Sequence, residues 1–140
     1  MLRILVAVDG SASSMHAVRH LAKLLQGQPE SEVHILNVQV PLPGAASRFL
    51  SRKDVKAFHS DEGDRALKEA RRLLDEAGVQ YEPHVAVGQI APTIVDYAEE
   101  RRCDQILMGT RGLGPVENLL LGSVAMKVLH LTKLPVTLVK

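Results

Sequence analysis

The sequence predicts one doubly wound α/β domain, in which a parallel sheet carries helices on both faces. Strand-like and helix-like segments alternate along all 140 residues, and no linker or shift of composition divides them. Apolar residues make up 46% of the chain, which is enough for a sizeable core. Strict alternation is typical of parallel strands joined by crossover helices. We therefore expect a single domain over residues 1–140.

The first elements follow from local pattern. A β-branched, apolar run at 4–8 predicts a strand buried on both faces. A helix should then run to about Gln26, with Ser11 or Ser13 accepting from the free amides of its first turn. The run at 33–40 predicts the second strand.

The middle of the chain continues the alternation. Proline and glycine interrupt any periodic pattern at 41–47, which predicts a loop. A charged amphipathic helix is expected at 54–77, with Gly78 as its C-terminal cap. A third strand is expected at 79–87, and Pro83 within it favours an edge position because proline cannot donate to a neighbouring strand.

The last third supplies two further strand and helix pairs. Apolar periodicity predicts helices at 88–102 and 123–132. Short apolar runs predict strands at 104–109 and 134–139. The second of these runs closes the chain and could form an open sheet edge.

Composition excludes several classes of partner. The chain has 17 basic and 16 acidic residues, a net charge of +1, so neither nucleic acid nor an anionic membrane is expected as its main partner. No apolar stretch approaches the roughly 18 residues of a membrane span, and no signal peptide begins the chain, so we expect a cytoplasmic protein. Cys103 is the only cysteine, which excludes an intrachain disulfide and suggests a small core filler.

Glycines gather where a ligand site is expected. Ligands of doubly wound sheets bind beyond the carboxyl ends of the strands, and "GTRGLGPVENLLLGS" begins at such an end. Gly109 and Gly112 allow close approach of the backbone, and Gly122-Ser123 opens the last helix, whose first amides are unpaired. A polyanion would meet donors throughout. The stretch is neither a Walker loop, since the required Lys and Ser/Thr are missing, nor a dinucleotide fingerprint, since the third glycine is missing.

The spacing Gly109-x2-Gly112-x9-Gly122-Ser123 resembles the ATP-binding motif of the universal stress protein family. The resemblance covers the whole chain, through "ILVAVDGS", "HILNVQVPLP", "VAVGQIAPTIVDYAEERRCDQILMGTRG", "LLLGSVAMKVL" and "LPVTLVK" in order. It implies strand order 3-2-1-4-5 and a fold similar to the adenine nucleotide α hydrolases. It also implies an adenine nucleotide as ligand, ATP or else AMP or ADP, with or without Mg²⁺.

The resemblance assigns a role to each matching residue. Ala7, Val8 and Asp9 would line the adenosine, with Asp9 near the ribose or a phosphate-bound Mg²⁺. Adenine would meet the backbone of Val38 and the side chain of Met108. The ribose and phosphates would be approached by Gly109 and Gly112, and the phosphate tail would accept from Gly122, Ser123 and Val124. Relatives often carry basic residues between the last two glycines, whereas here Arg111 is the one local cation, which predicts a weaker hold on a triphosphate.

Structural explanations compete with these roles. The glycines could serve a tight loop that binds nothing, and Asp9 could cap the first helix or its turn. His16 and His20 have the i, i+4 spacing of a zinc pair but lack an evident third ligand. His34, His59, His84 and His130 are scattered along the chain, so no metal site is predicted.

The favoured function is a universal stress protein that binds ATP and couples nucleotide occupancy to its dimer or partner state. It should hydrolyse ATP at most slowly, since no catalytic residue stands out. One alternative is a nucleotide-independent interaction protein that dimerises through strand 134–139; a homodimer through this strand is expected in either case. Another is a weak Mg²⁺-dependent ATPase that uses Asp9.

Overall fold

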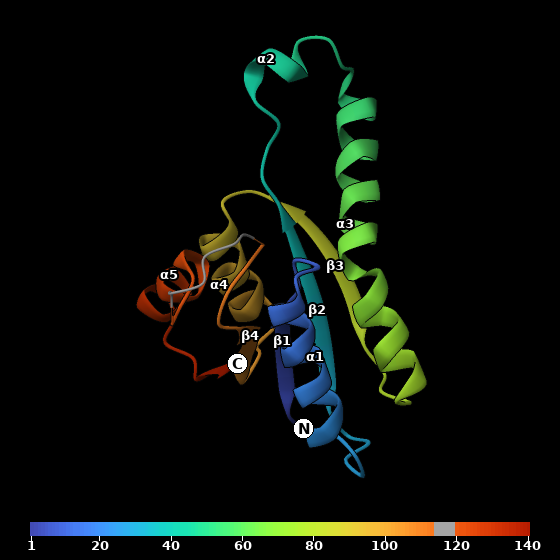
Figure 1. Ribbon diagram of the computed structural model, residues 1–140, viewed down its shortest axis with the longest axis vertical. Coiled ribbons are helices and arrows are strands. Elements are labelled where there is room, and N and C mark those ends of the chain that lie inside the picture. Colours follow the sequence, from blue (N-terminus) through green and yellow to red (C-terminus); the bar gives the residue numbers. More distant parts are fainter. Residues whose placement is uncertain (114–119) are drawn as a thin grey trace.

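The computed structural model describes residues 1–113 and 120–140 and contains a five-stranded parallel sheet of order β3-β2-β1-β4-β5 (Figure 1). This is the predicted order. The strands are β1 (Arg3–Ala7), β2 (Glu32–Gln39), β3 (Glu82–Val87), β4 (Gln105–Gly109) and β5 (Val136–Val139). The helices are α1 (Ala12–Leu24), α2 (Gly44–Ser47), α3 (Arg52–Glu76), α4 (Ile90–Glu100) and α5 (Ser123–Leu131).

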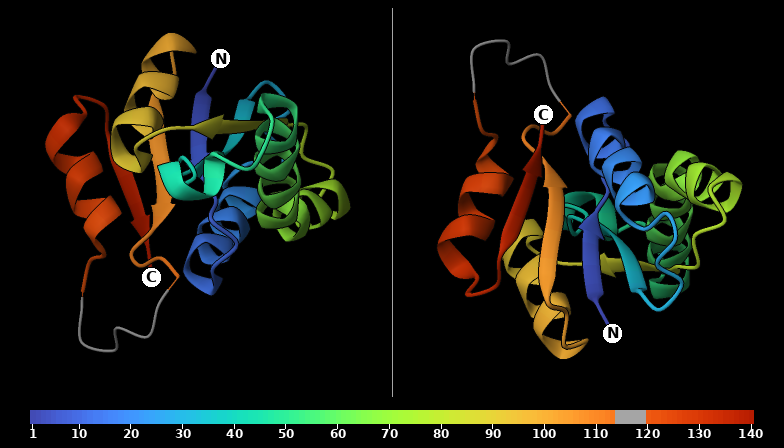
Figure 2. Two further views of the ribbon diagram at one scale, coloured as in Figure 1. Left: turned by 90° about the horizontal axis from the view of Figure 1, so that it is seen from above. Right: turned by 90° about the horizontal axis from the view of Figure 1, so that it is seen from below.

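Two helical layers cover the sheet, with α1 and α3 on one face and α4 and α5 on the other (Figure 2). Alternate residues of β1 enter opposite layers: Ile4 and Val6 pack under α1 and α3, whereas Leu5 packs under α4 and α5. All three side chains are fully buried, as expected for the central strand of a parallel sheet.

Local signals identified most element ends within a few residues. Ser11 is the N-cap of α1, where its hydroxyl accepts from the amide of Ser14 at 3.1 Å. Gly78 follows α3 with φ of +70°, the left-handed conformation of a C-terminal cap. Pro83 does lie in an edge strand, since β2 is the one partner of β3 among the described residues.

The expected loop at 41–47 is partly wrong, because residues Gly44–Ser47 form the short helix α2. Pro43 precedes this helix, and its carbonyl accepts from the amides of Ala46 and Ser47 at 2.9 and 3.0 Å. The fixed φ of proline suits the start of a helix, which local punctuation alone did not reveal. Helix α2 and the first half of α3 lie beyond the sheet (Figure 1).

None of the helices in the described parts of the chain is both long enough and apolar enough to cross a membrane. The longest, α3, has 25 residues but is charged along most of its surface.

Candidate functional site

A pocket of about 850 Å³ lies at the carboxyl ends of β1, β2 and β4, where the order of the strands reverses. Its volume suits a small organic ligand. All eleven residues named from the sequence line it: Ala7, Val8, Asp9, Val38, Met108, Gly109, Arg111, Gly112, Gly122, Ser123 and Val124. They come from four separate segments, which the sheet order brings together.

One end of the pocket is apolar. Val38 at the end of β2 and Met108 on β4 line it together with Ile90 and Ile94 of α4. Met108 and Ile94 belong to the core beneath α4 and α5, so neighbouring side chains hold this wall in place. A flat ring system is the kind of group that such a surface would bury.

Asp9 lies at the polar end, beyond β1. Its Oδ1 atom accepts from the amide of Ser11 at 2.8 Å, so the carboxylate caps the turn before α1. Its Oδ2 atom lies against Gly112, where an added Cβ would be 3.2 Å away. Asp9 therefore caps the turn before α1, and its Oδ2 atom takes no part in that cap. Asp9 is also part of the pocket wall.

Gly109 is explained by helix packing, whatever occupies the pocket. A Cβ on this residue would lie 2.5 Å from both the carbonyl carbon and the carbonyl oxygen of Ser13 in α1. The hydroxyl of Ser13 also accepts from the amide of Arg111 at 3.1 Å. The first turn of α1 thus holds the end of β4, and only glycine fits at this contact.

The expected set of free amides needs one correction. The amide of Gly122 donates to the carbonyl oxygen of Thr110 at 2.6 Å, so this donor is already used within the protein. Gly122 is the N-cap of α5 and has no side chain to cap it. The amides of Ser123 and Val124 begin the helix and have no acceptor within it, which leaves the positive end of α5 at the pocket.

The expectation that Arg111 is the one local cation is wrong. Arg65 and Glu62 also line this pocket. They lie on α3, in the helical layer on the other face of the sheet from α5. The two side chains are paired, with Nη1 and Oε1 3.2 Å apart. Sequence analysis missed them because they lie on the charged face of a helix far from every motif. Glu117, the only charged residue between Gly112 and Gly122 in the sequence, falls outside the described residues.

Asn37 is a further pocket residue without a sequence signal. It is buried in β2, and its Nδ2 atom donates to the carbonyl of Val8 at 2.8 Å. Its Oδ1 atom accepts from Gln39 at 2.6 Å. This amide fixes the ends of β1 and β2 relative to each other.

The histidines are not all scattered, which corrects a further expectation. His34 and His84 meet on β2 and β3, with ring nitrogens 3.0 Å apart, outside the pocket. Burial lowers the pKa of His84, and the charge of Arg101 lowers it further. The hydrogen bond with His34 lowers the pKa of Glu32. The cluster was invisible in the sequence because its residues lie fifty positions apart and only strand pairing joins them.

The fold and the pocket define a class of protein: a doubly wound α/β domain with a ligand-sized pocket at the switch point of its sheet. The sequence matches the model of the universal stress protein family over residues 1–140, and the chain belongs to this family.

Related proteins agree with this assignment. A universal stress protein of Methanocaldococcus jannaschii is 34% identical over 143 residues, covering 99% of this chain and 81% of that protein. The structure of a universal stress protein from Archaeoglobus fulgidus superposes with a TM-score of 0.76 at 26% identity, covering 100% of this chain and 99% of that chain. A universal stress protein solved in complex with cAMP has a TM-score of 0.73 at 27% identity, covering 99% and 97%.

Proposed function

We propose that this protein binds an adenine nucleotide, ATP or its di- or monophosphate, in the pocket at the carboxyl ends of β1, β2 and β4. The single observation that carries the proposal is the polarity of this pocket. It runs from an apolar wall, formed by Val38 and Met108, to the first turn of α5 at Ser123. A nucleotide has the same order of chemistry, from a flat base to an anionic tail.

Each end of the pocket has a physical reason to favour its part of the ligand. The base gains from leaving water for the surface of Met108 and Val38. The phosphates gain from the amides of Ser123 and Val124, which have no acceptor within the helix, and from the dipole of α5. A related protein at 27% identity was solved in complex with cAMP, which supports the same class of ligand here.

Binding, with at most slow hydrolysis, suits the side chains around this pocket. Among the described residues that line it, the ionisable groups are Asp9, Glu62, Arg65 and Arg111. Asp9 already uses one oxygen in its turn, and Glu62 is paired with Arg65. A Mg²⁺ ion held by the free oxygen of Asp9 would neutralise phosphate charge. No group is left as an evident general base.

The test is isothermal titration calorimetry of the protein with ATP, AMP and cAMP. Ser123→Glu places a negative charge in the first turn of α5, where it suits the helix but repels phosphate. It should weaken ATP binding at least about tenfold. The matched control, Ser47→Glu on α2, makes the same exchange outside the pocket and should bind as the parent does.

Gly122→Val provides a second variant at the same point. Its side chain would press on the backbone of Arg111, whose Cα lies 3.4 Å from an added Cβ. If Ser123→Glu and Gly122→Val both bind ATP like the parent protein, the nucleotide site lies elsewhere.

A second candidate function is assembly through β5. In the described part of the chain, this strand is an edge of the sheet and pairs with β4 alone. The neighbouring helix α5 exposes Met126, Leu129 and Leu131. An open strand edge beside exposed apolar side chains favours pairing with a second copy of the chain. Nucleotide binding would influence this dimer through α5, because the first turn of α5 lines the pocket and its last turn leads to β5.

A further inference from the structure

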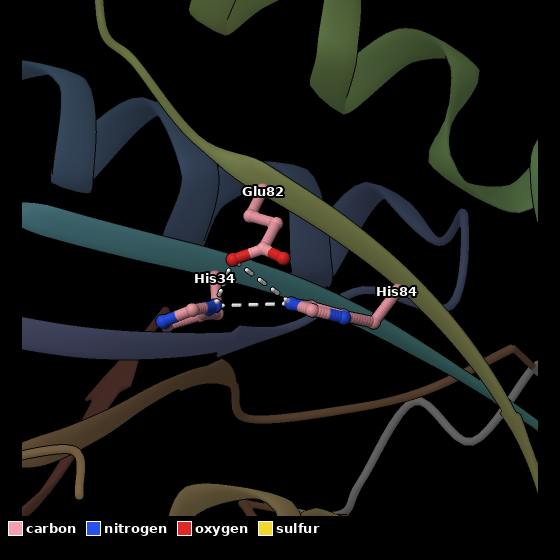
Figure 3. Close-up of side chains that lie close together, drawn as sticks. All are labelled: His34, Glu82 and His84. Atoms are coloured by element: carbon pink, nitrogen blue, oxygen red, sulfur yellow. Dashed lines mark hydrogen bonds and ion pairs between the residues drawn. The ribbon is translucent and has the colours of Figure 1, made fainter. Parts of the chain in front are cut away.

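A cluster of two histidines and a glutamate occupies the β3 edge of the sheet, away from the nucleotide pocket (Figure 3). His34 lies on β2, and Glu82 and His84 lie on β3. Strand pairing sets His34 directly beside Glu82. Because residues two apart in a strand share a face, His84 projects to the same side as Glu82.

The three side chains converge on one point. The Nδ1 atom of His34 lies 3.0 Å from Nε2 of His84. The Oε2 atom of Glu82 lies 3.5 Å from the first of these nitrogens and 3.9 Å from the second. Figure 3 shows the two rings meeting edge to edge with the carboxylate across both. Ligands bound at 2.0–2.1 Å around a tetrahedral zinc ion lie roughly 3.3 Å apart, so modest side-chain rotation satisfies this geometry.

A fourth residue orients the cluster from outside. The Oε1 atom of Glu32 lies 2.7 Å from Nε2 of His34, and Arg3 holds the other oxygen of Glu32 at 3.2 Å. A carboxylate that accepts from the distal nitrogen of a histidine leaves the near nitrogen with its lone pair free. This is the usual support of a metal-binding histidine.

Burial restricts access to one direction. The side chains of His34 and His84 are 3% and 8% exposed, whereas that of Glu82 is 64% exposed. The ring of Tyr97 on α4 closes the inner side, with its centroid 5.3 Å from that of His84. An ion would enter past Glu82 and keep water in its fourth position.

We propose that His34, His84 and Glu82 form a zinc site, with Glu32 as the outer carboxylate that positions His34. Two imidazole nitrogens and one carboxylate oxygen are ligands that zinc prefers, whereas Mg²⁺ and Ca²⁺ favour sets made of oxygen alone. Arg101, stacked over Tyr97 at 4.9 Å, adds a positive charge that limits the affinity. The site ties β2 to the edge strand β3.

The competing explanation is a hydrogen bond between two neutral histidines. In that arrangement His34 gives its Nε2 proton to Glu32, so its Nδ1 atom must accept from the Nε2 proton of His84. Glu82 would then contribute nothing, because its oxygen lies beyond hydrogen-bond distance of His84. The effect of Glu82 on zinc uptake therefore separates the two explanations.

The experiment is zinc titration of tag-free protein, stripped with a chelator and free of nucleotide, by calorimetry and elemental analysis. We expect one zinc ion per chain, with affinity reduced about 10- to 100-fold in Glu82→Gln and Glu32→Gln. The exposed position of Glu82 keeps this variant folded, which circular dichroism verifies. The control is His16→Gln on α1, an exposed histidine at i, i+4 spacing from His20, and it should bind as the parent does.

Three results would overturn the proposal. One is absence of zinc from the parent protein, and another is parental affinity in Glu82→Gln. The third is loss of zinc in His16→Gln, which would move the site to α1. At the same zinc concentration, zinc should also raise the melting temperature of the parent by more than that of Glu82→Gln. None of these measurements depends on nucleotide, so the two proposals stand or fall separately.

Discussion

Gly63 in α3 lies so close to Val85 in β3 that a Cβ on the glycine would lie 2.5 Å from Cγ2 of the valine. This contact sets the distance between the long helix and the edge strand. It also explains why a residue with poor helix propensity occurs in the middle of α3.

Gly63→Ala should lower the free energy of unfolding by about 1–3 kcal/mol, because the overlap with Val85 outweighs the roughly 1 kcal/mol that alanine gains in a helix. Urea denaturation measures the change. Adding Val85→Ala should recover part of the loss, giving a favourable coupling energy between the two sites. Gly44→Ala in α2, where no atom of the residues that the structure describes lies within 4 Å of an added Cβ, is the control and should be nearly neutral. Additive effects of the two changes would contradict the contact.

Gly109 and Gly112 should respond differently to alanine. Gly109→Ala meets the backbone of Ser13 and should destabilise the ligand-free protein by about 1–3 kcal/mol. Among the described residues, Gly112→Ala meets one side-chain oxygen of Asp9 at 3.2 Å instead of backbone, so its cost should be smaller. Thermal unfolding of both variants without nucleotide provides the comparison. Equal melting temperatures would mean that α1 does not hold the end of β4 as described.

The two arginines of the pocket should contribute unequally to nucleotide binding. Arg65 is already paired with Glu62, so Arg65→Gln should reduce the affinity for ATP by a smaller factor than Arg111→Gln does. Each factor should shrink for AMP, which carries less charge, and at higher salt. Calorimetric titrations at two salt concentrations test this order. A larger loss in Arg65→Gln would show that the pair with Glu62 opens when the ligand binds.

The β5 edge should produce a homodimer at micromolar concentration, detectable by light scattering. Leu131→Glu, at the end of α5 beside this edge, should raise the dimer dissociation constant at least about tenfold. Leu24→Glu makes the same change at an exposed site on α1 and should leave the dimer intact. A parent protein that stays monomeric with and without ATP would remove this prediction.

Cys103 should be chemically inert in the folded protein. Burial, together with the charges of Glu32 and Asp104, raises the pKa of its thiol from 9.0 to about 11. Reaction with Ellman's reagent near neutral pH should therefore be slow, and should become fast in urea. A fast native reaction would mean that the segment between α4 and β4 opens readily.

The same shift in pKa makes stability depend on pH. The unfolded thiol ionises at lower pH than the folded one, so the contribution of Cys103 is complete below pH 9 and is lost as the pH rises toward 11. Cys103→Ala should remove this part of the loss of stability between pH 9 and pH 11. Identical pH profiles for the two proteins would contradict the shift.

The order of the elements could be predicted because burial leaves a periodic record along the chain. The run at 4–8 predicted a strand buried on both faces, and the run at 104–109 predicted a short strand. The glycine spacing from Gly109 to Ser123 indicated the pocket that the structure contains. The short helix α2 was missed, since four residues carry too little periodicity to separate a helical turn from a loop.

What the sequence determined by itself was the alternation of strands and helices, the edge position of β3 and, through the family resemblance, eleven of the residues that line the pocket. Tertiary structure alone decided that Arg65 faces this pocket, that Gly109 serves the packing of α1, and that His34 meets His84. The physical reason is the distance along the chain over which each kind of interaction acts. Hydrophobic period and turn chemistry act between near neighbours in the chain, whereas contacts between distant segments depend on strand register and helix placement, which no local pattern records.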